Sequence, residues 1–186
     1  MLIRLDQCPP QPWKNGLGRT RELAVQPSVD GGAGFLWRVS IAEVDSAAPF
    51  SAFPGVDRTI VLLDGAGFTM TLDGRCEHAL TTPFEPFDFP GEAGVTVALA
   101  GGPTRDFNLM VRRMYARGDL QVWHQPTTRM TDEATVLVFC ARGMIDTDEG
   151  RLHAGDAWRP AAPAIASMSL HEGALALVAR IMPHLA

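Results

Sequence analysis

The chain consists of short apolar stretches rich in Val, Ile, Thr and Phe, with glycine-containing turns between them. Asp64-Gly65 and Asp73-Gly74 each separate two such stretches, and Asp-Gly is a strong hairpin signal. Helical periodicity is hard to find, and 20–26 and 129–135 are expected to be turns or bent strands. The sequence therefore predicts an all-β protein, either a sandwich or a barrel. The expected strands are 35–44, 59–63, 67–72, 95–99, 106–112, 119–124, 135–140 and 174–181.

A repeat suggests how these strands are organised. Residues 59–75 align with residues 135–151 without a gap, at a constant offset of 76 residues, and five of the 17 pairs are identical. Chance similarity between two hairpins is the alternative explanation. A duplication predicts two unequal cupin-like β-barrels (a bicupin of the double-stranded β-helix or jelly-roll type), over 1–118 and 119–186. Terminal strands could be exchanged between the barrels, and the first barrel is expected to hold the ligand pocket.

Composition and chain ends exclude several classes of protein. The formal net charge is −5, and such a mildly acidic chain is a poor nucleic-acid binder. No apolar run approaches the roughly 18 residues of a membrane helix, and the N-terminus lacks the pattern of a secretory signal. Cys8, Cys76 and Cys140 are odd in number and widely spaced, which fits neither a disulfide framework nor a metal knuckle. We therefore expect a reduced, cytoplasmic protein with no membrane partner.

The spacing of reactive side chains gives no metal, cofactor or nucleophile motif. No two of the five histidines lie within ten residues of each other, so none has ligand spacing on one strand or turn. A phosphate-binding loop, a dinucleotide fingerprint and a serine nucleophile elbow are all missing. We expect no metal, no cofactor and no catalytic residue that spacing alone can assign.

The densest group of unusual residues is the segment 12–22, PWKNGLGRTRE. Trp13, Lys14 and Asn15 precede Gly16 and Gly18, which allow backbone conformations that other residues avoid. Lys14 is the only lysine beside 15 arginines, and an ammonium is a compact, flexible charge unlike a guanidinium. The segment predicts a ligand-binding loop; the alternative is a solvated loop lysine.

Two strands carry polar residues at alternating positions. In 35–44, alternation places Arg38 and Ser40 on the face opposite Trp37. In 106–112, Asp106 and Asn108 share one face. The four polar residues could line one cavity. The alternative is two outer faces with a surface ion pair.

A third segment, 49–58, leads into the strand at 59–63. It contains two phenylalanines three residues apart, then Pro54-Gly55, and it ends at Arg58. Arg58 at the mouth of a strand could bind a carboxylate in bidentate fashion. The alternative is a salt bridge with Asp57 or Glu43, beneath a phenylalanine pair that covers the barrel end.

Together these segments resemble the HutD/Ves family. The resemblance rests on PWKNGLGRTRELA (12–24), WRVSIAEV (37–44), FSAFPGVDR (50–58), LLDGAG (62–67) and DFNLMVRR (106–113). Residue 17 departs from it, because the family pattern resembles Gly-Gly-Gly where this chain has Gly16-Leu17-Gly18. The resemblance implies a metal-free bicupin-like fold linked to bacterial histidine utilisation, in a regulatory or ligand-sensing role. Formylglutamate, urocanate or a related acid would be the ligand.

The resemblance also implies a set of ligand-binding residues. Lys14 and Arg58 would supply positive charge to a carboxylate, and Arg38 would do the same or pair with Asp106. Trp13 would form a wall of the pocket, and three side chains would orient polar atoms of the ligand. The full set is Trp13, Lys14, Asn15, Arg38, Ser40, Arg58, Asp106 and Asn108.

The sequence thus favours a cytoplasmic, metal-free protein that binds a small anionic metabolite and modulates histidine breakdown. Two other classes stay open. One is a cofactor-free isomerase, lyase or hydrolase, with Lys14 as base or Schiff-base former, or Asp106 as general base. The other is a protein-interaction module in which barrel edges pair, and a homodimer is compatible with any of the three.

Overall fold

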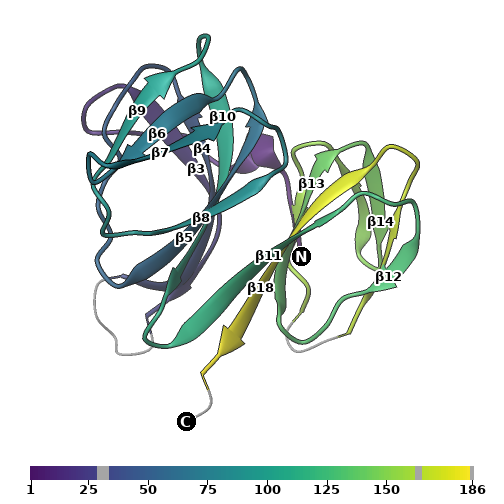
Figure 1. Cartoon of the computed structure of the whole chain (residues 1–186). Coiled ribbons are helices and arrows are strands. Elements are labelled where there is room, and N and C mark those ends of the chain that lie inside the picture. The colour runs from purple at the N-terminus through teal and green to yellow at the C-terminus, as the bar shows by residue number, and fades with distance from the viewer. Residues whose placement is uncertain (29–33, 162–164, 185–186) are drawn as a thin grey trace. The chain divides into compact units, whose positions relative to one another are not determined.

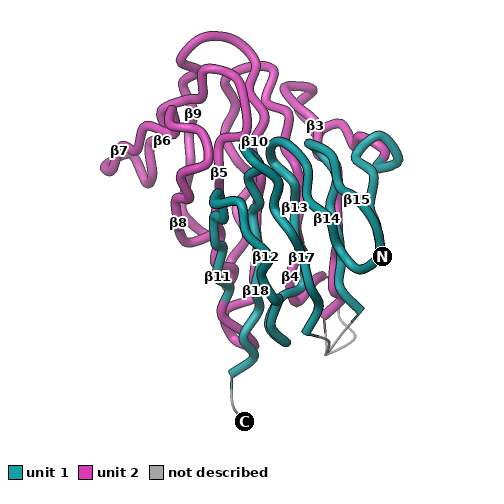
Figure 2. Tube along the Cα trace, turned by 90° about the vertical axis from the view of Figure 1, so that its right-hand side faces the viewer, with its two compact units in different colours: residues 1–8, 118–185 teal, residues 9–117, 186 magenta. Residues whose placement is uncertain are grey.

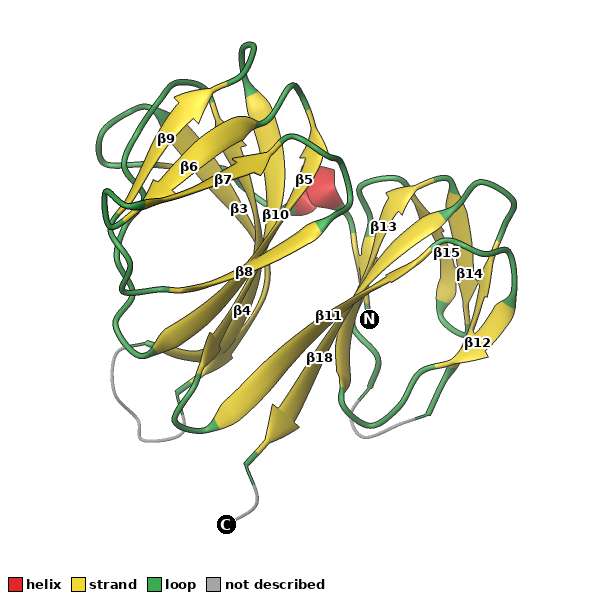
Figure 3. Cartoon of the chain, viewed as in Figure 1, coloured by secondary structure: helices red, strands yellow, loops and turns green. Residues whose placement is uncertain are grey.

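The computed structural model describes residues 1–28, 34–161 and 165–184, and nearly all regular elements in these ranges are β-strands (Figure 3). The exception is a single turn of 3-10 helix, η1 (Leu5–Gln7). The prediction of an all-β protein is confirmed. No helix within the described ranges is long and apolar enough to cross a membrane.

The chain divides into two compact units (Figure 2). We call residues 9–117 the N-terminal unit, and residues 1–8 together with the chain from Gly118 onward the C-terminal unit. The first eight residues thus group with the later part of the chain. The sequence alone placed them with the first part.

The N-terminal unit contains a six-stranded and a three-stranded antiparallel sheet (Figure 1). The larger sheet has the order β2 (Gln11–Pro12), β3 (Gly18–Pro27), β4 (Phe35–Val44), β10 (Thr104–Arg112), β5 (Val56–Asp64), β8 (Pro86–Pro90). The smaller sheet has the order β7 (Cys76–Leu80), β6 (Phe68–Leu72), β9 (Val95–Leu99). The expected bent strand near 20–26 is β3, whose register with β4 shifts between Glu22 and Ala24.

The register of β4, β10 and β5 determines which side chains share a face. Asn108 lies opposite Ser40 on one side and Ile60 on the other. Met110 lies opposite Arg38 and Arg58. Since side chains alternate along a strand, the even-numbered residues of these three strands lie on one face of the sheet. The predicted alternation in 35–44 and 106–112 is confirmed.

An apolar cluster joins the two sheets of this unit. It includes Ile60 and Leu62 from β5, and Phe68 and Met70 from β6, all without measurable exposure. Each such side chain contributes about 2 kcal/mol when it is removed from water. The cavity described below lies at one end of the same layer, where Trp13 and Phe50 pack against the cluster.

The C-terminal unit has the same two-sheet plan. One sheet has the order β1 (Leu2–Ile3), β16 (Ala157–Trp158), β13 (Thr135–Arg142), β18 (Leu175–Pro183), β11 (Ala116–Trp123). The other has the order β12 (Thr128–Met130), β17 (Ser167–Leu170), β14 (Met144–Thr147), β15 (Gly150–His153). Strand β1 pairs with β16, so Leu2 lies opposite Trp158. An apolar cluster built around Ile145, Leu152 and Trp158 joins the two sheets.

The prediction of barrels was wrong in one respect, since the sheets do not close. Each of the four sheets has two edge strands in the described chain, for example β2 and β8 in the largest. Pro86 and Pro90 lie in β8, and proline has no amide hydrogen to extend a ladder beyond an edge. Each unit is therefore an open two-sheet sandwich.

The repeat corresponds to similar structure in both units. Residues 59–75 run from β5 in the larger sheet to β6 in the smaller one, and 135–151 run from β13 to β14 in the same way. Each segment then enters a hairpin, β6–β7 or β14–β15. Duplication itself stays a prediction.

Candidate ligand-binding site

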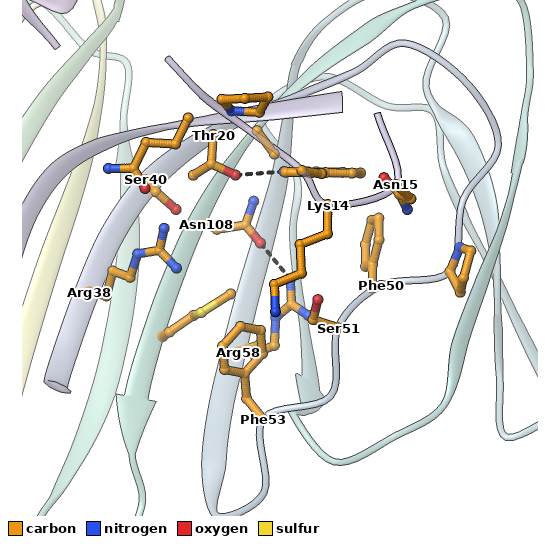
Figure 4. Close-up of a pocket in the computed structure, with 16 residues that line it drawn as sticks. Lys14, Asn15, Thr20, Arg38, Ser40, Phe50, Ser51, Phe53, Arg58 and Asn108 are labelled. Atoms are coloured by element: carbon orange, nitrogen blue, oxygen red, sulfur yellow. Dashed lines mark hydrogen bonds between the residues drawn. The ribbon is translucent and has the colours of Figure 1, made fainter. Parts of the chain in front are cut away.

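A cavity of about 430 Å³ lies in the N-terminal unit. Its walls come from β3, β4, β5 and β10, from the loop after β2, and from the segment 49–53 (Figure 4). Seven of the eight residues predicted to bind a ligand line it. They are Trp13, Lys14, Asn15, Arg38, Ser40, Arg58 and Asn108. Asp106 is the eighth, and it does not line the cavity.

The loop between β2 and β3 places Trp13 and Lys14 at the cavity. The amide of Trp13 donates to the carbonyl of Gly18 (2.9 Å), and the amide of Gly16 donates to the carbonyl of Trp13 (3.0 Å). Gly16 has a φ of +70°, which favours glycine. Leu17, the departure from the family pattern, has no positive φ, so a side chain is tolerated there.

Asn15 closes this turn. Its Oδ1 accepts a hydrogen bond from the amide of Leu17 (3.1 Å), which forms an Asx-type turn. Figure 4 shows its side chain pointing away from Arg58. The structure therefore gives Asn15 a role in shaping the loop that carries Lys14.

Gly18 lets the Trp13 ring approach the backbone. A Cβ at residue 18 would lie 2.6 Å from the carbonyl oxygen of Glu43 and 2.9 Å from two ring carbons of Trp13. The indole Nε1 donates to Thr20 Oγ1 (2.8 Å), and the ring meets Phe50 edge-on with centroids 6.3 Å apart. Trp13 is thereby held as a wall of the cavity.

Lys14 contributes an ammonium to the cavity. Within the described chain, this side chain forms no ion pair and no hydrogen bond. Figure 4 shows it extending from the loop toward Arg58 and Phe53. The lone lysine of the sequence therefore directs an uncompensated positive charge at the cavity.

Arg58 is a buried cation without a carboxylate partner in the described chain. It is 6% exposed, and its guanidinium donates to Asn108 Oδ1 (2.9 Å) while Nε has no partner. Phe89, Phe50 and Phe53 surround the guanidinium carbon at 4.7, 5.3 and 5.7 Å from their ring centroids. Burial, and the nearby charge of Arg38, lower the pKa of Arg58 to about 10, so it stays protonated at neutral pH.

The two carboxylates predicted as alternative partners of Arg58 form ion pairs with other arginines. Asp57 accepts from Arg113 (2.8 Å), and Glu43 pairs with Arg19 and Arg21. The phenylalanine pair expected to cover the end of the barrel instead packs around the Arg58 guanidinium. A salt bridge from Arg58 to Asp57 or Glu43 is therefore excluded in this structure.

Arg38 is the third cation of the cavity. Its Nε donates to Glu22 Oε2 at 3.0 Å, so this charge is compensated. The predicted pairing of Arg38 with Asp106 was wrong, because Glu22 on the neighbouring β3 lies within reach and Asp106 is further along the sheet. Of the three cations, only Lys14 and Arg58 lack a carboxylate among the described residues.

Asp106 is buried in the apolar layer beside the cavity. It has no measurable exposure, and neither carboxyl oxygen has a hydrogen-bond partner in the described part of the chain. Burial and the nearby Asp64 carboxylate raise the pKa of Asp106 to about 8, against a weaker opposing effect of the Thr104 hydroxyl. At neutral pH this carboxyl is therefore mostly protonated.

Several residues of the site were not predicted from the sequence. Thr20 and Glu22 were read only as part of a motif, although they hold Trp13 and Arg38. Met110 also lines the cavity, and alternation from Asn108 would have placed it there. The sequence does not show that β3 pairs with β4. For this reason the Glu22–Arg38 contact could not be predicted.

The described residues contain no group of three or more His, Cys, Asp or Glu side chains placed to hold a metal ion. What the cavity presents is two uncompensated cations, aromatic walls, and the polar side chains of Ser40 and Asn108. Such an arrangement can bind a small organic anion, because carboxylates form strong charge-assisted hydrogen bonds with ammonium and guanidinium groups.

Comparison with known proteins identifies a family and relatives that match most of the chain. The HutD family model matches residues 6–177. A Pseudomonas putida protein described as an uncharacterized 21.2 kDa protein in the hutC 3' region is 40% identical over 146 residues, 78% of this chain and 75% of that protein. Protein Ves of Cronobacter sakazakii is 40% identical over 111 residues, 59% of each chain.

Two solved structures superpose on nearly the whole chain. HutD from Pseudomonas fluorescens SBW25, solved in a formate condition, superposes with a TM-score of 0.88 at 30% identity, over 100% of this chain and 99% of that one. A cupin 2 conserved barrel domain protein from Leptotrichia buccalis superposes with a TM-score of 0.61 at 7% identity, over 99% and 96% of the two chains. The second likeness concerns the fold alone and shows that the fold is cupin-like.

Proposed function

This chain belongs to the HutD family, and we propose that it binds a small carboxylate metabolite in the cavity of its N-terminal unit and thereby regulates histidine utilisation. Family membership and the relative from a hut region suggest a role in histidine utilisation. The ligand, the regulation and a cytoplasmic location are our proposals.

The observation that carries the proposal is the pair of cations at the cavity. A buried charge without a partner is destabilising, yet Arg58 is 94% buried with no carboxylate among the described residues. Lys14 extends toward the same part of the cavity and is also unpaired (Figure 4). An anion that bridges the two groups would supply the missing negative charge.

The remaining walls favour an organic anion. Trp13, Phe50 and Phe53 offer flat apolar surface, and Ser40 and Asn108 offer hydrogen bonds. This combination fits a short carbon skeleton that carries a carboxylate and at least one further polar atom. N-formylglutamate and urocanate are the first compounds to test.

The cytoplasmic location is consistent with the three cysteines, all of which are free thiols. We also propose that the two units arose by duplication, which the aligned segments 59–75 and 135–151 and their equivalent hairpins support. The N-terminal unit would then have acquired the cavity through its additional N-terminal segment.

A thermal-shift screen tests the proposal. The wild-type protein is expected to be stabilised by N-formylglutamate, urocanate or a small carboxylate at millimolar concentration, because a ligand that binds the folded state raises its stability. Lys14→Ala and Arg58→Ala should each abolish the shift, since each removes one of the two unpaired cations.

Arg151→Met is the matched control. Arg151 is an exposed arginine of the C-terminal unit that pairs with Asp146 and does not line the cavity, so this variant makes the same change of charge at a residue outside the proposed site. It should respond to the acids as the wild type does. Absence of a shift with every acid, or an unaltered shift in Lys14→Ala, would contradict the proposal.

A further inference from the structure

Asp106 is completely buried, and the geometry of the described residues gives its carboxyl group no hydrogen-bond partner. Both carboxyl oxygens are inaccessible and lack hydrogen bonds among the described residues. The Thr104 hydroxyl donates instead to the carbonyl of Asp64 (2.9 Å). Such a group is destabilising whether or not it is ionised, and an ionised carboxylate is the more destabilising form. Asp106 is therefore a buried acid to which no contact in the fold assigns a role.

The elements packed against Asp106 offer it no cation. Its neighbours across the sheet are Ala42 on β4 and Leu62 on β5. In the opposite sheet, β6 contributes Phe68 and Met70 to the same apolar layer. The charged group that acts on Asp106 is Asp64, which is itself paired with Arg105.

Two groups of charges on the neighbouring strands are engaged or lie further from Asp106. Arg38, with its partner Glu22, and Arg58 are at the cavity end of β4 and β5. Glu43 pairs with Arg19 and Arg21 on the opposite face of the sheet.

Asp106 is nevertheless close to the proposed anion site. It lies two residues before Asn108 on β10, and the two side chains share one face, so their Cα atoms are about 7 Å apart. Asn108 accepts the hydrogen bond from Arg58, and Ala42, the neighbour of Asp106 on β4, also lines the cavity. Asp106 and a bound anion are therefore separated by about the length of one residue. The protein between them has a low dielectric constant and screens their charges weakly.

In this geometry, the negative charge of a bound anion and that of an ionised Asp106 repel each other. A bound carboxylate disfavours ionisation of Asp106, and an ionised Asp106 repels the carboxylate. At a separation of roughly 8–10 Å and an effective dielectric constant near 20, repulsion between two unit charges corresponds to about tenfold or more in affinity. Linkage requires that each event weaken the other by the same factor.

We propose that anion binding in the cavity is coupled to protonation of Asp106, so that the protein binds its ligand tightly with Asp106 neutral and weakly with Asp106 ionised. This inference rests on the proposed function, because it needs an anion in the cavity. Because burial raises the pKa of Asp106 to about 8, the coupling acts at mildly alkaline pH. Ligand affinity is constant below this range and falls through it.

The test measures N-formylglutamate affinity by calorimetry between about pH 6.5 and about pH 9, where both carboxyl groups of this probe stay ionised. The protein carries Lys14→Arg, because a guanidinium keeps its charge and excludes titration of the ammonium. We expect affinity to fall about tenfold across the range. Adding Asp106→Asn should make the affinity nearly independent of pH.

A second measurement does not depend on the variant. Titrations near pH 8.5 in two buffers with different ionisation enthalpies report the protons exchanged on binding, and Asp106 intact should give a net uptake of protons. Failure of the wild-type protein to bind at any pH would contradict the proposed function. Binding without proton uptake, or an equal fall of affinity with Asp106→Asn, would overturn the coupling and leave the function standing.

Discussion

The two units share a two-sheet plan but differ in what they bury. Among the described residues of the C-terminal unit, the buried polar ones are Thr131 and Thr135, and both hydroxyls donate hydrogen bonds, to Ala166 and Asp132. In the N-terminal unit, Arg58 and Asp106 are buried with polar atoms that have no partner among the described residues.

The difference indicates where selection has acted on something other than stability. Unpaired buried polar groups reduce the free energy of unfolding, so a fold gains nothing from them without a ligand or a proton. The 76-residue offset that relates Thr59 to Thr135 places Ala134 at the position of Arg58. We therefore propose that the C-terminal unit acts as a structural core and that the N-terminal unit carries the function.

The largest loss of stability is expected in the C-terminal core. Leu152 is fully buried in the cluster around Trp158, and Leu152→Ala should lower the free energy of unfolding by about 3 kcal/mol. Urea unfolding measures this. The stabilisation that a bound acid provides should be unchanged. A variant that folds but no longer responds to acids would contradict the division of roles.

An effect at least as large, but opposite in sign, is expected for Asp106→Asn. Because folding raises the pKa of Asp106 from about 4 to about 8, the folded protein holds a proton that the unfolded chain has lost within this window. The free energy of unfolding of the wild type therefore falls as pH rises from about 4 to about 8, then levels off as far as Asp106 is concerned.

Asp106→Asn removes this contribution. Its free energy of unfolding should exceed that of the wild type by a margin that grows over the same window, to roughly 5 kcal/mol. Urea unfolding at several pH values gives the difference. A constant margin, or one that shrinks as pH rises, would mean that Asp106 does not titrate as we infer.

Arg58→Met tests whether the buried cation stabilises the fold. Met fills similar space and suits the three phenylalanine rings, so the free energy of unfolding should stay within about 1 kcal/mol of the wild type or rise. Thermal and urea unfolding without ligand check this. A loss much greater than about 2 kcal/mol would assign Arg58 a structural role.

The smallest effect on acid affinity among the cavity residues is expected at the wall that holds Trp13. Thr20→Val removes the acceptor of the Trp13 indole hydrogen bond, so the free energy of unfolding should fall by about 1 kcal/mol. Acid affinity should fall only about threefold, because Trp13 still packs on Gly18 and Phe50. A loss of affinity as large as that of Arg58→Met would show that Thr20 contacts the ligand directly.

Much of this contrast was visible in the sequence. Alternation in 35–44 and 106–112 placed Arg38, Ser40 and Asn108 on one face, and the structure brings them to the cavity. The single lysine drew attention to Lys14. These inferences succeeded because the side-chain period of a strand is fixed by local geometry.

Other features depend on pairing between distant segments. Leu2–Ile3 is too short to signal a strand, and its pairing with β16 follows from contacts more than 150 residues apart. Asp106 satisfied the alternation rule but lies beyond the cavity, since the rule gives the face of the sheet and not the position along it. The open edges of the sheets likewise depend on which strands meet.

Calorimetric titration of Arg58→Met and Arg151→Met tests whether the ligand binds at the buried arginine. The titrant is the acid that stabilises the wild type most. Both variants lose one positive charge, the first at the cavity and the second on the exposed surface of the C-terminal unit. We predict that Arg58→Met weakens affinity at least about tenfold and that Arg151→Met changes it less than about twofold. Equal affinities for the two variants would contradict a binding site built on the buried arginine.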